Sequence, residues 1–114
     1  MMVERASIWL ADLNPTRGSE QAGTRPVLIF QNNAINPFSR TVLAIPMTTN
    51  LRRAALPSCV QISKGEGGLA SDSVALCHQI RVLDKRRLQR ELGKITPQTM
   101  AAIESCVLFT MGIV

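Results

Sequence analysis

The sequence predicts one mainly β domain with a C-terminal helix, built as a small β-barrel of SH3-like type. Short apolar runs rich in β-forming residues recur along the chain, separated by polar loops that contain turn-forming residues. Apolar residues at helical spacing follow a helix-start signal only near the C-terminus. The 114 residues are enough to bury one core without metals or disulfides, so residues 1–114 are expected to form one domain.

The predicted strands of the first half are residues 7–11, 27–30 and 41–45. Pro26 favours an extended conformation for the residue before it and marks the start of the second strand. Residues 15–26, which precede that strand, carry two glycines, two arginines and a glutamate. A long loop in a short chain tends to be functional, so this loop is the first candidate for a site.

The second half is predicted to hold more strands before the helix. Residues 59–62 form a short strand, and residues 73–83 form either one long strand or two strands with a kink. In the second part of that segment, side chains would alternate between the two faces of a strand. Gln79 and Arg81 would lie on one face, and Ile80 and Val82 on the other. If the apolar face is buried, the polar face is available for contact.

A capping residue introduces each of the last two predicted elements. Asp84 is a candidate N-cap for a short cationic helical turn at 85–88, in a segment that Leu92 and Gly93 would close. Thr96 as N-cap, followed by a proline, starts the terminal helix. Its apolar residues recur at helical spacing and are predicted to pack, in the core or at a dimer interface: Met100, Ile103, Val107, Leu108 and Met111.

Composition limits the classes of function. The net charge is +5 and arginine supplies most of the cations, which favours phosphate contact and points to nucleic acid or an acidic protein as partner. The few aromatic residues argue against a platform that stacks on single-stranded bases. No apolar run approaches the roughly 18 residues of a membrane span and no signal-peptide core is present, so a cytoplasmic protein without membrane contact is expected.

The cysteines and the histidine do not predict a metal site or a cofactor. Cys59, Cys77 and Cys106 are odd in number and widely spaced, so they are expected to be buried apolar residues. Only one histidine exists, and the chain has neither a phosphate-binding loop nor a dinucleotide-binding fingerprint. We therefore expect no metal and no cofactor.

Arg25 is the first candidate for chemistry. Its guanidinium is a fork of fixed donors at the root of the loop, and with Glu20 it is suited to gripping a phosphate beside a carboxylate that moves a proton. The alternative is a surface ion pair between these two side chains. Thr48, at a strand end, can donate to a phosphate oxygen or cap the turn.

Several segments, taken in order, resemble the MazF/PemK family of bacterial toxins, most closely its chromosomal MazF-like branch. They are Trp9-Leu-Ala-Asp-Leu13, Gly18-Ser-Glu-Gln21, Gly23-Thr-Arg-Pro-Val27, Pro46-Met-Thr-Thr49, Asp72-Ser-Val74 and Gln79-Ile-Arg81. Their order and spacing span nearly the whole chain. The resemblance implies a homodimer of SH3-like barrels, the fold of CcdB, MazF and Kid toxins, that cuts single-stranded mRNA at short sequences without a metal. It also implies inhibition by a cognate MazE-like antitoxin.

The resemblance also implies which residues form the site. Arg25 and Thr48 match the catalytic arginine and threonine of similar toxins, and Glu20 matches a glutamate implicated in acid/base work or substrate contact. RNA contact is expected of Gln79, which matches a substrate-contacting position, and of nearby residues: Arg17, Ser19, His78 and Arg81. The chemistry implied is attack by the ribose 2′-OH on its own phosphate, which gives a 2′,3′-cyclic phosphate and a 5′-OH.

The sequence departs from one branch of the family at His78. Plasmid-borne PemK/Kid-like members carry a catalytic arginine and aspartate on the strand that here reads Leu76-Cys-His78, so that pair is absent and His78 occupies the aspartate's place. His78 is either hydrogen-bonded at a strand end or takes part in proton transfer or base recognition. Glu20 and His78 are therefore both candidates for the base.

Two other functions compete with the endoribonuclease. A non-catalytic CcdB-like toxin, which inhibits DNA gyrase by protein contact, would share the fold but has no need for Arg25, Glu20 and Thr48 together. A simple nucleic-acid-binding module is disfavoured by the moderate charge and the scarce aromatic residues.

Overall fold

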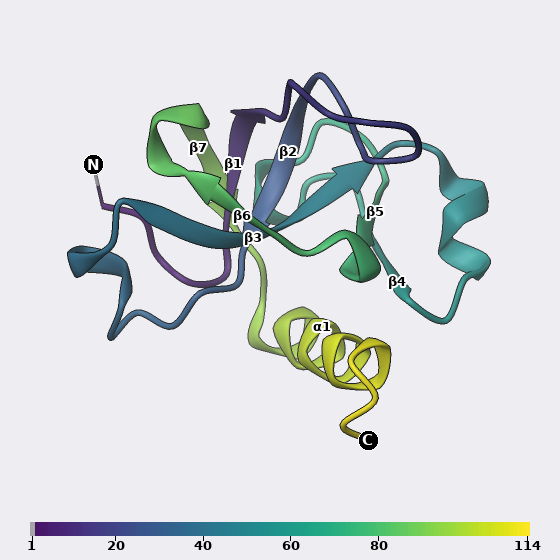
Figure 1. Cartoon of the computed structure of the whole chain (residues 1–114). Coiled ribbons are helices and arrows are strands. Elements are labelled where there is room, and N and C mark those ends of the chain that lie inside the picture. The colour runs from purple at the N-terminus through teal and green to yellow at the C-terminus, as the bar shows by residue number, and fades with distance from the viewer. Residues whose placement is uncertain (1) are drawn as a thin grey trace.

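The structure is a computed structural model that describes residues 2–114 and shows a strongly bent antiparallel sheet with one α-helix beside it (Figure 1). Seven strands form the sheet: β1 (Ser7–Asp12), β2 (Thr24–Ile29), β3 (Thr41–Thr48), β4 (Cys59–Ile62), β5 (Ser73–Leu76), β6 (Arg81–Asp84) and β7 (Leu88–Lys94). Helix α1 (Pro97–Thr110) follows the last strand. The mainly β fold with a C-terminal helix is confirmed, and within residues 2–114 the two edge strands β4 and β7 do not pair to close the barrel.

Strand β3 has three partners. The strand order is β4-β5-β3-β2-β1-β7, and β6 pairs with β3 outside this path. One edge of β3 pairs with β2, whereas the other edge pairs with β6 over residues 41–44 and with β5 at Met47 and Thr48. The short 3₁₀ turn η4 (Cys77–Gln79), which connects β5 to β6, therefore lies beside the middle of β3.

Both faces of the sheet are buried. One core cluster includes Ile8 and Leu28 and extends to α1, and a second includes Trp9 and Val27 and extends to β6 and β7. Because side chains alternate along a strand, neighbouring residues of β1 and β2 enter different clusters. This explains why these strands read as continuous apolar runs in the sequence rather than as alternating ones.

The segment 73–83 is two strands separated by η4, which is one of the two options that the sequence left open. The predicted faces are wrong, because Val82 is 61% exposed whereas Leu83 is buried in the second cluster. The 3₁₀ turn interrupts the two-residue alternation, so the side-chain directions in η4 do not continue into β6.

Residues 85–94 include a strand that the sequence did not predict. Asp84 caps a 3₁₀ turn, η5 (Lys85–Arg87), as expected, and its carboxylate accepts a hydrogen bond from the Arg86 backbone N–H at 2.8 Å. Hydrogen bonds from the Arg86 side chain and backbone lower the pKa of Asp84 to about 2. Leu92 and Gly93 do not close a helical segment, because they lie within β7, which pairs with β1.

Helix α1 begins as predicted, and its apolar residues divide between the core and the surface. The Thr96 hydroxyl accepts a hydrogen bond from the Thr99 backbone N–H at 3.2 Å, and a proline follows Thr96. Three of the residues predicted to pack are buried: Met100, Ile103 and Val107. Leu108 and Met111 are instead 39% and 62% exposed, in an apolar end of the chain that also includes Phe109, Ile113 and Val114. Within residues 2–114, no helix has the length and apolar character that crossing a bilayer requires.

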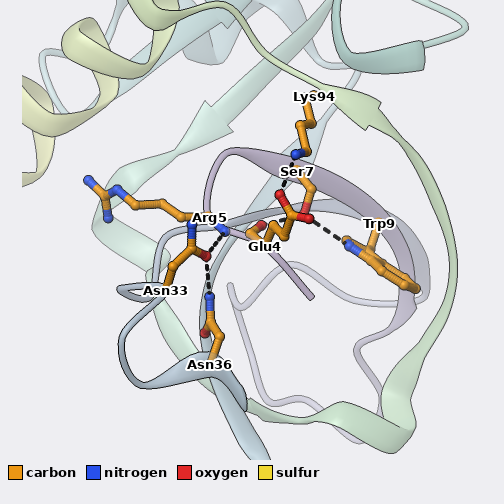
Figure 2. Close-up of polar contacts among 7 residues, drawn as sticks. All are labelled: Glu4, Arg5, Ser7, Trp9, Asn33, Asn36 and Lys94. Atoms are coloured by element: carbon orange, nitrogen blue, oxygen red, sulfur yellow. Dashed lines mark hydrogen bonds and ion pairs between the residues drawn. The ribbon is translucent and has the colours of Figure 1, made fainter. Parts of the chain in front are cut away.

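Arg5 connects the N-terminal segment to two distant parts of the chain. Its backbone N–H donates to Asn33 Oδ1 at 2.8 Å in the loop after β2 (Figure 2). Its guanidinium lies 4.5 Å from the centre of the Phe30 ring and forms an ion pair with Glu104 of α1. These contacts fix β1 relative to the helix.

The three cysteines are free. Cys77 and Cys106 are buried, as expected, but Cys59 is only half-buried. Burial raises the pKa of the Cys77 and Cys59 thiols, so both stay protonated near neutral pH.

Candidate active site

The loop between β1 and β2 is held in shape by its own hydrogen bonds. At its base, the Leu13 N–H donates to the Gly23 carbonyl at 3.0 Å, and the Gly23 N–H donates to Asn14 Oδ1 at 3.2 Å. Gly23 has a φ of 81°, which residues with a side chain adopt only at a cost. Further along, the Glu20 carboxylate accepts a hydrogen bond from the Arg17 N–H at 2.5 Å.

Arg25 lies on β2, one residue past the start of the strand. Its Nε donates to the Ala22 carbonyl at 3.2 Å, which directs the guanidinium back along the loop. The ion pair with Glu20, the alternative raised by the sequence, is absent from residues 2–114, where the ion pairs involve other side chains. Arg25 is exposed and therefore available to an anion from solution.

Thr48 ends β3 and lies near Arg25. Its Oγ1 accepts a hydrogen bond from the Asn50 N–H at 3.2 Å, so the capping role is present and the hydroxyl proton is still available to donate. Both residues line one small hollow, here named the arginine hollow, together with Pro26, Met47, Thr49 and Ser73. The structure thus brings together two of the three residues that the resemblance implies are catalytic.

Glu20 lines a different hollow, here named the glutamate hollow. It has a volume of about 320 Å³ and is also lined by His78, Gln79, Ile80 and Arg81. The His78 Nδ1 lies 3.0 Å from the Ser58 hydroxyl, which is the hydrogen-bonded arrangement at a strand end that the sequence allowed. Glu20 and His78 therefore share one hollow, and both lie outside the one that Arg25 and Thr48 line.

Gln21 connects the two hollows, a role that the sequence did not reveal. Its backbone N–H donates to Gln79 Oε1 at 2.6 Å, and its side-chain Nε2 donates to the Met47 carbonyl at 2.9 Å. Gln79 Nε2 in turn donates to the Ser19 carbonyl at 3.2 Å. The only signal in the sequence was that Gln21 closes the Gly-Ser-Glu-Gln segment.

Arg25 lines one hollow and Arg81 the other, and further arginines lie in the segments beside them. Arg17, Arg25 and Arg81 form no ion pair with any carboxylate of residues 2–114. The 3₁₀ turn η2 (Leu51–Ala55), just beyond Thr48, adds Arg52 and Arg53. Such a concentration of unpaired arginine attracts a polyanion. Among the described residues, no group of three or more histidine, cysteine or acidic side chains is arranged to hold a metal ion.

A family model described as "PemK-like, MazF-like toxin of type II toxin-antitoxin system" matches residues 4–110. The chain belongs to this family. The toxin is also 39% identical over 112 residues to the Endoribonuclease MazF of Staphylococcus epidermidis, a match that covers 98% of the toxin and 93% of that relative. The family assignment made from the sequence is confirmed, and the CcdB-like alternative is not favoured.

Solved structures of similar chains share the fold of the toxin. MazF (Form-I) from Deinococcus radiodurans has a TM-score of 0.85 at 23% identity, with 98% of both chains covered. An endoribonuclease in complex with its cognate antitoxin, from a Mycobacterial species, has a TM-score of 0.80 at 28% identity, with 96% of the toxin and 95% of that chain covered. The curved sheet with a terminal helix is therefore common to the toxin and these relatives.

Proposed function

We propose that the toxin is a sequence-specific, metal-independent endoribonuclease that cleaves single-stranded RNA, in particular mRNA. The observation that carries this proposal is that Arg25 and Thr48, from adjacent strands, line one hollow. The identity to an Endoribonuclease MazF supports the same activity. The ribose 2′-oxygen bonds to the adjacent 3′-phosphate as its proton is removed, the bond from phosphorus to the 5′-oxygen of the next nucleotide breaks, and that oxygen takes up a proton. The products are a 2′,3′-cyclic phosphate and a 5′-OH, and DNA is not a substrate because it lacks the 2′-OH.

Each catalytic residue has a distinct part in this reaction. Arg25 stabilises the negative charge that develops on the phosphorane, because its donors are not neutralised by a carboxylate of residues 2–114. Thr48 donates its hydroxyl proton to a non-bridging oxygen. Glu20 removes the proton from the 2′-OH, and His78, across the glutamate hollow, is the alternative base. Cleavage that is unchanged in His78→Ala would exclude the histidine.

RNA beyond the scissile phosphate contacts the arginines in and beside the two hollows, here named the cationic rim: Arg17, Arg25, Arg52, Arg53 and Arg81. Arg81 and His78 line the glutamate hollow, and Arg17 and Ser19 are exposed on the loop beside it. Arginine at such positions binds phosphates or base edges, whereas the serine and histidine supply shorter-range hydrogen bonds. These four residues are among the proposed RNA contacts.

The toxin acts in the cytoplasm as a homodimer, and a cognate MazE-like antitoxin inhibits it. The apolar end of the chain offers a surface to a second copy. A relative with the same fold is an endoribonuclease in complex with its cognate antitoxin. An acidic antitoxin with a disordered tail would bind over the cationic rim and exclude RNA.

The test is incubation of purified toxin with a long unstructured RNA in excess EDTA, followed by mapping of the cut sites and of the end chemistry. We expect cuts at one short motif with cyclic phosphate ends, and loss of cleavage in Arg25→Ala. Arg40→Ala, which removes an exposed arginine before β3, is the matched control and should cut normally. Intact RNA, or undiminished cleavage by Arg25→Ala, would refute the proposal.

A further inference from the structure

Two glutamine side chains attach the loop before β2 to the rest of the sheet. Gln79, at the end of η4, uses both ends of its amide: Oε1 accepts from the Gln21 N–H at 2.6 Å, and Nε2 donates to the Ser19 carbonyl at 3.2 Å. Gln21 reaches the other way and donates from Nε2 to the Met47 carbonyl on β3 at 2.9 Å. Three hydrogen bonds therefore join the loop to η4 and to β3.

These hydrogen bonds matter because Gln21 lies between Glu20 and the residue that positions Arg25. Glu20 precedes it, and Ala22, whose carbonyl accepts from Arg25 Nε at 3.2 Å, follows it. The carbonyl that accepts from its side chain belongs to Met47, the residue before Thr48. A shift of Gln21 would therefore change the positions of Glu20 and Arg25 relative to Thr48.

We propose that Gln21 and Gln79 are positioning residues that hold the loop, and with it Glu20 and Arg25, in a fixed place relative to Thr48 while an RNA spans the glutamate hollow and the arginine hollow. This rests on the proposed endoribonuclease function. Gln79 matches a substrate-contacting position in similar toxins, but both ends of its amide are hydrogen-bonded to the loop backbone. The Gln79 side chain could therefore hydrogen-bond to an RNA base only after those hydrogen bonds break. Gln79 thus acts on the reaction through the loop.

Cleavage kinetics on a short RNA that contains the cut motif distinguish a residue that positions the loop from one that recognises an RNA base. We expect Gln21→Ala and Gln79→Ala each to lower kcat by about 10- to 100-fold, with KM changed by less than about threefold and the same motif cut. Gln79→Glu keeps an acceptor for the Gln21 N–H and loses the donor to Ser19, so its kcat should lie between those of the wild type and Gln79→Ala. The double variant should lose less than the product of the two single losses, because both bonds hold one loop.

Trypsin cleavage after Arg17 tests the loop without RNA. Gln21→Ala and Gln79→Ala should each speed this cleavage about fivefold or more, because a loop that has lost hydrogen bonds to η4 or β3 opens more often. Gln61→Ala is the control, since Gln61 is exposed on β4 and its side chain has no hydrogen bond within residues 2–114. If the toxin fails to cut RNA, this measurement still decides whether the loop is held.

Two results would overturn the proposal. The first is a Gln79→Ala variant that keeps kcat but cuts a motif altered at one base, since Gln79 would then be a base reader. The second is a rate of trypsin cleavage after Arg17 that is the same in both glutamine variants and in Gln61→Ala.

Discussion

Thr48 combines two hydrogen-bonding roles that mutation can separate. Its oxygen caps the turn through the Asn50 N–H, and its proton is proposed to bind the phosphate. Thr48→Val keeps the shape of the side chain but removes both the accepting oxygen and the donating proton, whereas Thr48→Ser keeps the hydroxyl and so both hydrogen-bonding roles. We expect kcat to fall by about 10²- to 10³-fold in the valine variant, the usual loss when one donor to the transition state is removed, and by far less in the serine variant.

Single-turnover cleavage under saturating RNA measures this difference, and thermal unfolding of both variants shows whether the turn survives. A Thr48→Val protein that folds normally and cuts at the rate of the wild type would show that the hydroxyl only caps the turn.

The catalytic candidates were predictable because loop and strand boundaries mark them. Arg25 precedes a proline that favours an extended conformation, although β2 begins at Thr24 and so earlier than predicted, and Thr48 stands where an apolar run ends. The role of Gln21 was not predictable, because its partners lie 58 and 26 positions away and a hydrogen bond at that separation leaves no local pattern. The separation of Glu20 from the arginine hollow could not be read from the sequence for the same reason.

At the scale of elements, β7 shows why a strand was missed. Leu88–Lys94 contains several charged residues and a glycine, and only one edge of it is paired, so its apolar signal is weak. Its pairing with β1 also shifts register twice, which breaks the alternation that a sequence pattern would need. The buried strands β1, β2 and β3 gave a clear signal because both of their faces are covered.

Gly93 of β7 is required by a close approach of two backbones. A Cβ added there would lie 2.7 Å from the Gly67 carbonyl carbon in the turn η3 (Glu66–Gly68). Because the obstacle is backbone, it cannot rotate away, and we expect Gly93→Ala to lower the free energy of unfolding by about 1–3 kcal/mol. Urea denaturation measures this, with exposed Gln89→Ala on the same strand as the control, for which we expect a change within about 0.5 kcal/mol. Equal effects of the two substitutions would contradict the steric explanation.

Glu66 makes the stability of the start of α1 depend on pH. Its carboxylate accepts a hydrogen bond from the Thr96 N–H at 3.0 Å. Burial by itself would raise the pKa of Glu66, but hydrogen bonds from Thr99 and Thr96 outweigh it and lower the pKa below the ordinary 4.5. Since the folded pKa is the lower one, this stabilisation is present above about pH 4.5 and is lost as the pH falls through the folded pKa.

We therefore expect the wild type to lose more free energy of unfolding than Glu66→Gln when the pH is lowered from about 6 to about 3. Urea titrations at each pH provide the comparison, and the effect of Asp84 cancels because both proteins contain it. Parallel losses in the two proteins would mean that the Glu66 contact does not stabilise the start of the helix.

At the scale of the whole molecule, the apolar end of the chain predicts self-association. Phe109 is 54% exposed and Met111 is 62% exposed, next to other apolar residues of the last turn. We expect Phe109→Glu to shift the sedimentation mass from twice the 12.5 kDa of one chain to that mass, because a buried unpaired charge is costly at an interface. Gln89→Glu, with the same charge change on β7, should remain dimeric. A dimeric Phe109→Glu protein would place the interface elsewhere.

The architecture as a whole was predicted more fully than the connections within it. The number of apolar runs and the single helix signal were enough for a mainly β fold with a terminal helix. How the sheet bends, and which strand pairs with which part of β3, depend on contacts between segments far apart in the chain, such as β3 with β6. No local pattern contains that information.

The division of one edge of β3 between β5 and β6 has a consequence for how such toxins diversify. The connector that carries His78 and Gln79 lies between two strands that are each paired with β3, so a residue inserted there would leave both strand pairings in place but would shift Gln79 away from the loop that it binds. A residue inserted into β3 would displace Thr48 from its neighbour across the sheet. Among related toxins with other target sequences, we therefore expect the exposed His78 to differ more often than Gln79 or the residues of β3.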